Sequence, residues 1–427
     1  LVAGMQAQVS LPSVFTDHMV LQQKSEVPVW GWGSASATIK VVGSWAPLDT
    51  ATTVVRSDGT WDTTLKTVGA GGPYTLSVLG DGTRELKDVM LGEVWLCSGQ
   101  SNMEWTPMHG IDNSEKEVAA ANYPNIRFFH IPKRGAATPQ NNCEASWAPC
   151  TPDKMKSTSA IAYFFGRDLQ KDLNVPVGLI VSAWGGTPAE VWVPEEQIMN
   201  NPRIRDVMPD KTYPWWPVEP GVLYNQMISP VVPYALAGAI WYQGESNRDH
   251  PDSYGILLKT MVESWRKSFK KDFPFYLVQI APFTYNAGDN GAALVREHQE
   301  WVARTVPGAG MVAVSDCVAD VKNIHPTDKQ SVGQRLANMA LGKIYGRLDS
   351  GYESPLFESM TIDKNKAVIS FLHAGNGLMC KDKEITGFMI AGEDGVFVPA
   401  KVRIKDNTVV VTSSKVKKPV VVHYCFD

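Results

Sequence analysis

Between Glu93 and about residue 346, apolar runs of strand length alternate with amphipathic segments of helix length. The candidate strands are EVWLCSG, IRFFHI, VGLIVSAWGG, AGAIWYQGES, FYLVQIAP and AGMVAVSD. The candidate helices span roughly residues 157–174, 252–270, 291–305 and 327–346. Continuous apolar strands joined by crossover helices are typical of a parallel sheet with both faces covered. We therefore predict an α/β domain over residues 91–350, with ligands bound at the carboxyl ends of the strands.

Strand patterns without helices flank this domain on both sides. Residues 9–90 contain short alternating runs such as VPVWGWG and YTLSVLG, separated by Asp-Gly turns, which predict a β-rich N-terminal domain resembling a small sandwich. Residues 351–427 return to runs such as AVISFLHAG and KPVVVHYCF, which predict a β-rich C-terminal region. A chain of 427 residues is longer than one hydrophobic core usually supports, so several units are expected.

Composition and charge narrow the function classes. Residues 1–8 are small and apolar like the end of a signal segment, which predicts a secreted or periplasmic protein. The net charge of -4 gives no electrostatic reason to expect nucleic acid, and no apolar run reaches the roughly 20 residues of a membrane span. Without a CxxC pair or another ligand motif, we expect no metal and no cofactor. Cys143 and Cys150 are close enough in sequence for a loop disulfide in an oxidising compartment.

The segment GEVWLCSGQSNM runs from an apolar strand into small polar residues and places Ser101 just after the strand end. A serine in that position can expose its hydroxyl at the top of the sheet, as a nucleophile of acyl transfer requires. Serine after glycine is also common in ordinary turns, so this segment alone is a weak indication.

Later strand ends carry groups that complement such a nucleophile. Gly185 and Gly186 in WGGTPAEVW could bring a backbone N–H to an oxyanion, and Gln243 in WYQGESN could supply a side-chain amide. The alternative is a tight turn and an amide that bonds loop backbone. His325 in NIHP follows the last parallel strand and opens a helix, so it is well placed to take a proton from Ser101.

Together these segments resemble the sialate O-acetylesterase family of SGNH-type esterases. The resemblance extends over nearly the whole chain, through LPSVFTDHMVLQQ, GQSNMEW, GGTPAEVW, LYNQMISPVVP, GAIWYQGESN and IHPTDKQSVGQRLA. It implies a flavodoxin-like catalytic domain of the SGNH hydrolase type, with a three-layer parallel sheet. It also implies metal-free hydrolysis of acetyl esters, with O-acetylated sialic acid or a related acetylated glycan as the substrate.

The resemblance implies a role for each matching residue. Ser101 corresponds to the nucleophile and His325 to the general base, and the backbone N–H groups of Ser101 and of Gly186 or Gly185 correspond to oxyanion donors. Gln243 stands where the wider superfamily places an asparagine.

The acid that orients the histidine is left open. Related esterases often carry it two or three residues before the histidine, where this chain has Asn323 and Lys322. The candidates are Asp316, Asp320 and Glu245, and a dyad oriented by a backbone carbonyl is the remaining possibility.

Other functions are compatible with the same segments. An acetylesterase of xylan or another polysaccharide would use the same catalytic groups and differ in its loops. The Pro-rich, aromatic stretch 200–222 is either such a loop over the active site or a packed surface excursion. A carbohydrate-binding protein without catalysis would not require a serine, glycines, a glutamine and a histidine together at strand ends. A glycosidase with paired carboxylates, one of them Glu245, is the least favoured alternative.

Overall fold

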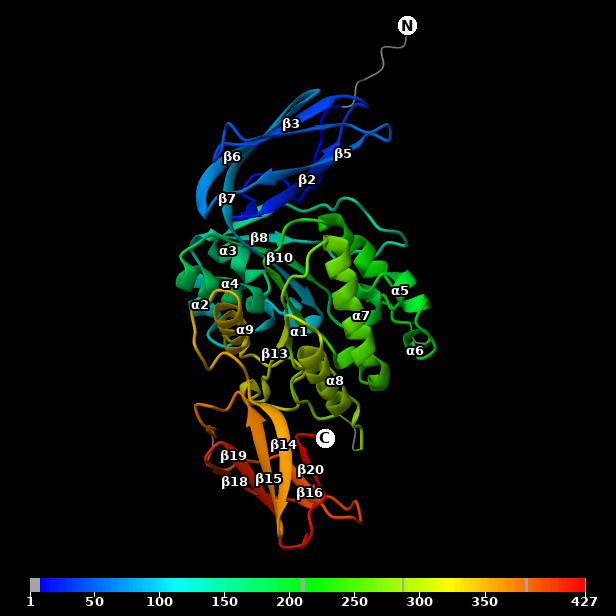
Figure 1. The fold of residues 1–427 in the computed structure, drawn as a ribbon, viewed down its shortest axis with the longest axis vertical. Coiled ribbons are helices and arrows are strands. Elements are labelled where there is room, and N and C mark those ends of the chain that lie inside the picture. The colour runs from blue at the N-terminus through cyan, green and yellow to red at the C-terminus, as the bar shows by residue number, and fades with distance from the viewer. Residues whose placement is uncertain (1–7, 209–211, 286–287, 381–382, 427) are drawn as a thin grey trace.

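The computed structural model describes residues 8–208, 212–285, 288–380 and 383–426. Figure 1 shows an elongated molecule, with a β-rich N-terminal part at one end, an α/β part in the middle and a β-rich C-terminal part at the other end. Residues 1–7 of the predicted signal remnant lie outside the described residues.

The N-terminal part is built mainly from short antiparallel strands, as the alternating runs predict, while β1 pairs with β7 in parallel. β2 pairs with β5, and β3 pairs with β4 and β6. Along β2 and β3, buried side chains alternate with more exposed ones, so one face of each of these strands packs inward. The strands are β1 (Val20–Gln22), β2 (Glu26–Trp32), β3 (Thr38–Gly43), β4 (Thr50–Val54), β5 (Thr60–Lys66) and β6 (Gly71–Gly80).

β7 (Gly82–Gly99) connects the N-terminal part directly to the central sheet. Its first half pairs with β6, and its second half pairs with β10 and β11. The predicted boundary at residue 90 therefore lies inside a continuous strand rather than in a linker. This strand leads directly toward Ser101. It is paired in the N-terminal part at its beginning and in the central sheet at its end, so the segment before the candidate nucleophile is firmly held.

The central sheet has the strand order β13-β12-β11-β7-β10-β8-β9. Every neighbouring pair in this order is parallel except β8 and β9, which are antiparallel. The α/β class is confirmed, and the antiparallel edge strand makes the sheet mixed. The strands beyond β7 are β8 (Tyr123–His130), β9 (Trp147–Cys150), β10 (Val177–Ala183), β11 (Gly238–Tyr242), β12 (Phe275–Val278) and β13 (Ala309–Val312).

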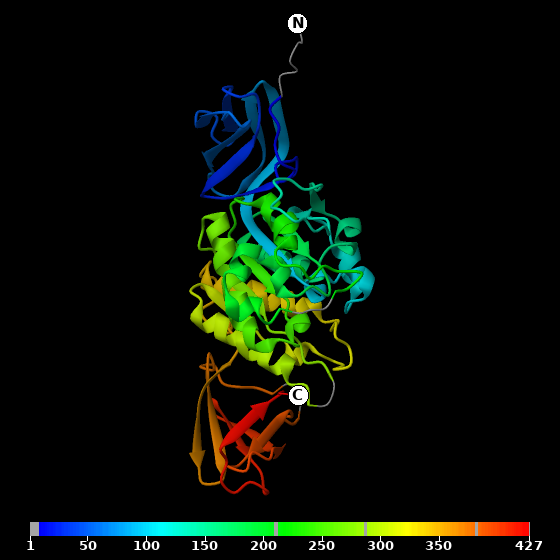
Figure 2. The same ribbon diagram turned by 90° about the vertical axis from the view of Figure 1, so that its right-hand side faces the viewer.

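The long helices confirm the amphipathic segments predicted from the sequence. They are α4 (Ala160–Leu173), α7 (Pro251–Phe269), α8 (Gly291–Thr305) and α9 (Lys329–Lys343). α4 packs against α9, and α7 packs against α8 (Figures 1 and 2). Shorter helices are α1 (Ser101–Glu104), α2 (Ser114–Ala120), α3 (Pro152–Lys156), α5 (Glu195–Met199) and α6 (Pro202–Arg205). Single turns are η1 (Pro107–His109), η2 (Ala189–Trp192), η3 (Tyr224–Ile228), η4 (Ser229–Val231), η5 (Glu245–Asn247) and η6 (Ser315–Cys317).

The C-terminal part is β-rich, as predicted, and has a hydrophobic core separate from that of the rest of the chain. Ile369, Ile390 and Val411 lie in that core. The sheets have the orders β14-β15-β19-β18 and β17-β16-β20. Their strands are β14 (Leu356–Asp363), β15 (Lys366–Leu372), β16 (Phe388–Ala391), β17 (Val398–Pro399), β18 (Lys401–Lys405), β19 (Thr408–Thr412) and β20 (Val421–Tyr424).

The loop disulfide considered for Cys143 and Cys150 is not formed, because both residues are free thiols. The Cys143 thiol contacts the Ser13 hydroxyl at 3.4 Å, whereas the Cys150 thiol donates to the carbonyl of Ala121. Cys150 is held at the end of β9, opposite Tyr123 of β8. Closeness in sequence therefore does not bring the two sulfur atoms together.

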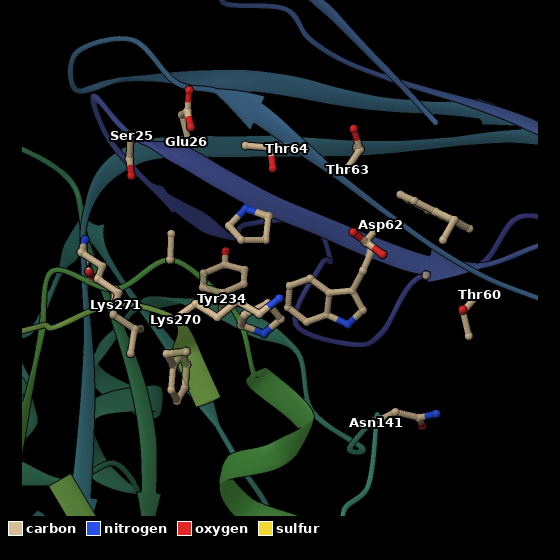
Figure 3. A pocket seen from close by; sticks show the side chains of 18 of the residues that line it. Ser25, Glu26, Thr60, Asp62, Thr63, Thr64, Asn141, Tyr234, Lys270 and Lys271 are labelled. Atoms are coloured by element: carbon tan, nitrogen blue, oxygen red, sulfur yellow. Dashed lines mark hydrogen bonds between the residues drawn. The ribbon is translucent and has the colours of Figure 1, made fainter. Parts of the chain in front are cut away.

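A cleft of about 650 Å³ lies between the N-terminal part and the α/β part. Figure 3 shows Thr60, Asp62 and Thr64 on one wall and Tyr234 and Lys270 on the other. The second wall is formed by segments that precede β11 and β12, at the amino ends of these strands. The candidate catalytic residues follow the opposite, carboxyl ends, so this cleft is separate from them. None of the helices described here is long and apolar enough to cross a membrane.

Candidate active site

Ser101 and His325 meet at the carboxyl edge of the central sheet. Ser101 is the first residue of α1, directly after β7, and His325 lies in the loop between β13 and α9. The Oγ of Ser101 and the Nε2 of His325 are 2.9 Å apart. The contact expected between these two side chains is therefore present across 224 residues of sequence.

The turn before Ser101 depends on a glycine. Gly99 has a φ of +144°, and a Cβ atom on it would lie 2.1 Å from the carbonyl oxygen of Tyr242. The next residue, Gln100, accepts the backbone N–H of Gly244 through its side-chain oxygen at 3.2 Å. The ends of β7 and β11 are thus locked together, and this fixes the point at which the chain turns into α1.

Asn102 connects the segment of the candidate nucleophile Ser101 to the loop that carries His325. Its fully buried amide donates to the carbonyl of Ile324 at 3.0 Å and to a carboxylate oxygen of Glu245 at 2.7 Å. Its oxygen accepts the ammonium of Lys329 at 2.5 Å. Neither Asn102 nor Lys329 is among the site residues predicted from the sequence, although both lie in the segments that carry the family resemblance.

The imidazole of His325 is half-buried against an aromatic side chain. It stacks on the indole of Trp105, with ring centroids 4.0 Å apart and planes inclined by 20°. Burial, followed by the positive charge of Lys329, lowers the pKa of His325 to about 4. The backbone N–H of His325 donates to the side chain of Asn323 at 3.0 Å, so the residue found where an acid was expected shapes the loop instead. The imidazole is therefore neutral near pH 7 and can accept a proton.

The three carboxylates considered as orienting acids make other contacts. Asp316 forms a two-pronged pair with Arg335, at 2.7 and 2.6 Å. Asp320 accepts the backbone N–H of Lys322 in an exposed turn. Glu245 is buried against Asn102, and burial raises the pKa of its carboxyl group. Within the described residues, no hydrogen bond joins any of the three to the His325 ring.

The two glycines of the predicted oxyanion turn are in different environments. Gly185 lies against Ser101, because a Cβ on the glycine would be 3.1 Å from the Cβ of Ser101. The N–H of Gly185 donates to Glu104 Oε2 at 2.6 Å. Gly186 has a φ of +80°, and its N–H has no protein acceptor among the residues that the structure describes. The open N–H is therefore that of Gly186.

A sequence model of the family described as carbohydrate esterase, sialic acid-specific acetylesterase, matches residues 91–342, which is more than half of the chain. The chain belongs to this family. The family resemblance inferred from the motifs is thereby confirmed.

The similarity to known proteins extends beyond the α/β part of the chain. The chain is 32% identical over 401 residues to a sialate O-acetylesterase of Pongo abelii, covering 84% of this chain and 76% of the relative. It is 31% identical to a sialate O-acetylesterase of Homo sapiens with the same coverage. The crystal structure of a carbohydrate acetylesterase from Xanthomonas citri superposes with a TM-score of 0.86 at 34% identity, covering 97% of this chain and 94% of that one.

In this family member, Gln243 lies in a fully buried network beneath the glycine turn. Its amide nitrogen donates to the carbonyl of Thr187 at 3.2 Å and to the side chain of Asn247 at 2.7 Å. Its side-chain oxygen accepts the hydroxyl of Tyr254 at 3.0 Å. Both amide hydrogens are therefore used inside the esterase, and the residue supports the turn from below.

A second buried network lies behind the Ser101–His325 pair. Burial lowers the pKa of the Lys329 ammonium to about 7, while the negative charge of Glu245 acts to raise it. Asn102 bridges the two groups. In the described parts of the esterase, no group of three or more His, Cys, Asp or Glu side chains is arranged to hold a metal ion.

Proposed function

We propose that this protein is a sialate O-acetylesterase, which hydrolyses acetyl esters of sialic acid through an acetyl-enzyme on Ser101. The observation that carries the proposal is the 2.9 Å contact between Ser101 Oγ and His325 Nε2 in a member of the sialic acid-specific acetylesterase family. The relatives named as sialate O-acetylesterases support sialic acid as the sugar.

The reaction proceeds by nucleophilic catalysis. Ser101 Oγ attacks the acetyl carbonyl while its proton passes to Nε2 of His325, which is neutral because of its low pKa. The tetrahedral intermediate collapses when the sugar oxygen leaves with the proton from His325. Water, deprotonated by the same imidazole, then attacks the acetyl-enzyme. Acetate is released when the Oγ–acyl bond breaks and the imidazolium returns the proton to Ser101 Oγ.

The oxyanion of the tetrahedral intermediate is bound by the backbone N–H groups of Ser101 and Gly186. Both are without a protein acceptor among the described residues. Gly185 and Gln243 hold the turn in place, because their donors are already engaged by Glu104 and by Thr187 with Asn247. Each oxyanion donor typically contributes a few kcal/mol to acyl transfer, roughly 3–4 kcal/mol in mutational studies.

The sugar ring lies on the aromatic segment that precedes η3. The ring of Trp216 covers Gly186, because a Cβ on that glycine would lie 2.5 Å from it. Tyr213 and Trp215 stand next to Trp216, with ring centroids 4.8 and 5.8 Å away, and Trp215 is 65% exposed. Flat exposed aromatic rings next to the oxyanion turn suit the C–H face of a sugar. This supports the first of the two interpretations of stretch 200–222.

The catalytic domain has the flavodoxin-like SGNH arrangement, with a three-layer parallel sheet. Support comes from the order β10-β7-β11-β12-β13, because these strands follow the flavodoxin-like order 2-1-3-4-5 when β8 is treated as an added edge strand. The α4–α9 and α7–α8 pairs supply the two helical layers. We assign residues 9–90, 91–350 and 351–427 to the three units.

Acetate release tests the proposal. O-acetylated sialic acid and acetylated xylan are offered at equal ester concentration to the wild-type protein and to Ser101→Ala and His325→Ala. We expect faster release from sialic acid and a loss of at least roughly 10⁴-fold in each variant. Faster release from xylan would reassign the substrate to a plant polysaccharide. Sugar binding without turnover would assign the chain to non-catalytic carbohydrate-binding proteins.

A further inference from the structure

The carboxylate of Glu104 lies next to the nucleophile although it matches none of the acids expected from the sequence. Glu104 is the last residue of α1, three residues after Ser101, so the two side chains are on neighbouring parts of one helix face. Oε2 of Glu104 accepts the N–H of Gly185 at 2.6 Å, and Gly185 in turn lies against Ser101. One carboxylate thus connects the nucleophile helix to the glycine turn.

The other oxygen of Glu104 is held by a lysine. Oε1 accepts the ammonium of Lys133 at 2.6 Å, and the side chains of Glu104 and Lys133 are 23% and 46% exposed. The ion pair is therefore partly accessible to solvent. Each of the two carboxylate oxygens of Glu104 nevertheless accepts a hydrogen bond. A fully solvated carboxylate would move freely, and this one is constrained by a backbone donor and by a cation.

The charged and titratable groups around His325 come from several elements. Lys329 acts on it from α9, His109 from η1 and Glu104 from α1. Glu104 is the carboxylate of this set, and it acts on the pKa of His325 in the direction opposite to Lys329 and His109. Glu104 also interacts with Lys133, which follows β8, and with His130, which is the last residue of β8. Lys154 of α3 acts on His130 as well.

We propose that, within the esterase reaction proposed above, Glu104 is the positioning residue that replaces a triad acid: its carboxylate anchors Gly185 against the nucleophile helix and faces the His325 imidazole with a negative charge. The first role keeps the neighbouring Gly186 N–H directed at the oxyanion. The second stabilises the imidazolium that forms while Ser101 attacks. Lys133 limits the repulsion between this carboxylate and the oxyanion.

Two variants separate these roles. Glu104→Gln retains an oxygen that can accept the Gly185 N–H but removes the charge, whereas Glu104→Ala removes both. Lys133→Met leaves the carboxylate and removes its counter-ion. Glu144→Gln is the matched control, because Glu144 forms a similar ion pair with Arg134 at 2.8 Å and is 77% exposed.

The first measurement is an NMR titration of the His325 ring in the protein without substrate, assigned with His325→Gln. We expect Glu104→Gln to lower the His325 pKa by about half a unit or more, because a negative charge that favours the imidazolium is lost. Lys133→Met should raise it, and Glu144→Gln should leave it unchanged. Shifts of opposite sign in two variants cannot arise from a general loss of structure.

The second measurement is the pH profile of kcat and KM for acetate release. Glu104→Gln should lower kcat about tenfold with little change in KM, and Glu104→Ala should lower kcat further. An unchanged His325 titration and kcat in Glu104→Gln would overturn the proposal. The NMR result does not depend on turnover, so a wild-type protein that releases no acetate would refute the esterase function and leave the titration as an independent test of Glu104.

Discussion

Replacing Asn102 by alanine should strongly weaken the connection between the nucleophile helix and the histidine loop. Asn102 is completely buried, and its side chain bonds the Ile324 carbonyl, the Glu245 carboxylate and the Lys329 ammonium at 3.0, 2.7 and 2.5 Å. Alanine removes all three contacts at once. It also leaves the lysine and the glutamate buried without the group that bridges them.

The expected cost follows from these contacts. A neutral hydrogen bond contributes about 1 kcal/mol and one to a charged group about 1.5–3 kcal/mol, so one of the first kind and two of the second amount to about 4–7 kcal/mol. Breaking buried ionic networks typically costs about 3–5 kcal/mol. We therefore expect Asn102→Ala to lower the free energy of unfolding by at least about 3 kcal/mol at pH 6, where Lys329, with a pKa of about 7, is protonated.

Urea unfolding followed by tryptophan fluorescence measures this cost, with acetate release as a second measure. Asn376→Ala is the control, because Asn376 donates one exposed hydrogen bond to Ser350, at 2.9 Å. The control should change stability by less than about 0.5 kcal/mol. An Asn102→Ala variant within about 1 kcal/mol of wild type, with full activity, would show that the bridge between Ser101 and His325 does not depend on this amide.

The remaining predictions concern the base, the turn and the aromatic segment. The base must be neutral to accept a proton, and the pKa of His325 is about 4. We therefore expect kcat/KM to stay constant from neutral pH to about pH 5 and to fall by half near pH 4. A half-maximum near pH 6.5 would contradict the effect of burial on the pKa of this ring. Gly99→Ala should lower the free energy of unfolding by about 2 kcal/mol or more and reduce kcat, because the alanine Cβ would collide with the Tyr242 carbonyl. Thermal melting and kinetics of acetate release measure these effects, and unchanged stability and kcat would refute the prediction. Trp215→Ala should raise KM about tenfold at constant kcat and unchanged melting temperature. Trp301→Ala, which changes another exposed tryptophan, should leave KM unchanged. Equal KM values for Trp215→Ala and wild type would show that Trp215 does not bind the sugar.

The central sheet and the meeting of Ser101 with His325 could be predicted from the sequence for one physical reason. Strands buried on both faces must be continuously apolar, so EVWLCSG and AGAIWYQGES are recognisable without any alignment. The carboxyl ends of parallel strands lie on one edge, so polar groups that follow them come together. Distance along the chain is irrelevant to that argument.

Hydrogen-bond partners could not be predicted in the same way. Gln243 follows a strand on the correct edge, yet its amide is used by Thr187 and Asn247, a choice made by side-chain geometry within a buried turn. Gly185 and Gly186 are adjacent in sequence, and only their contacts in the folded chain, such as that of Gly185 with Glu104, distinguish them. Strand periodicity carries no information about such contacts.

The same limit applies to the domain boundary and to the cysteines. The boundary expected at residue 90 lies inside β7 because a change of partner strand, from β6 to β10 and β11, leaves no break in the chain itself. Cys143 and Cys150 are separated by a short stretch of sequence, but Cys150 ends β9 whereas Cys143 lies before that strand, so the two thiols have different neighbours. Sequence spacing measures reach along the chain and does not give direction.

A serine esterase without a bonded triad acid must obtain two effects from other groups. Orientation of the imidazole comes here from stacking on Trp105 and from the Asn102 contact with Ile324, which fixes the loop. Neither contact supplies negative charge, while burial and Lys329 both make the base weaker. The charge that favours the imidazolium has to come from a carboxylate outside the histidine loop, and Glu104 is placed to provide it. Orientation and charge therefore reside on different residues, so a change at Trp105 should reduce kcat at every pH, whereas a change at Glu104 should also move the pH at which activity begins.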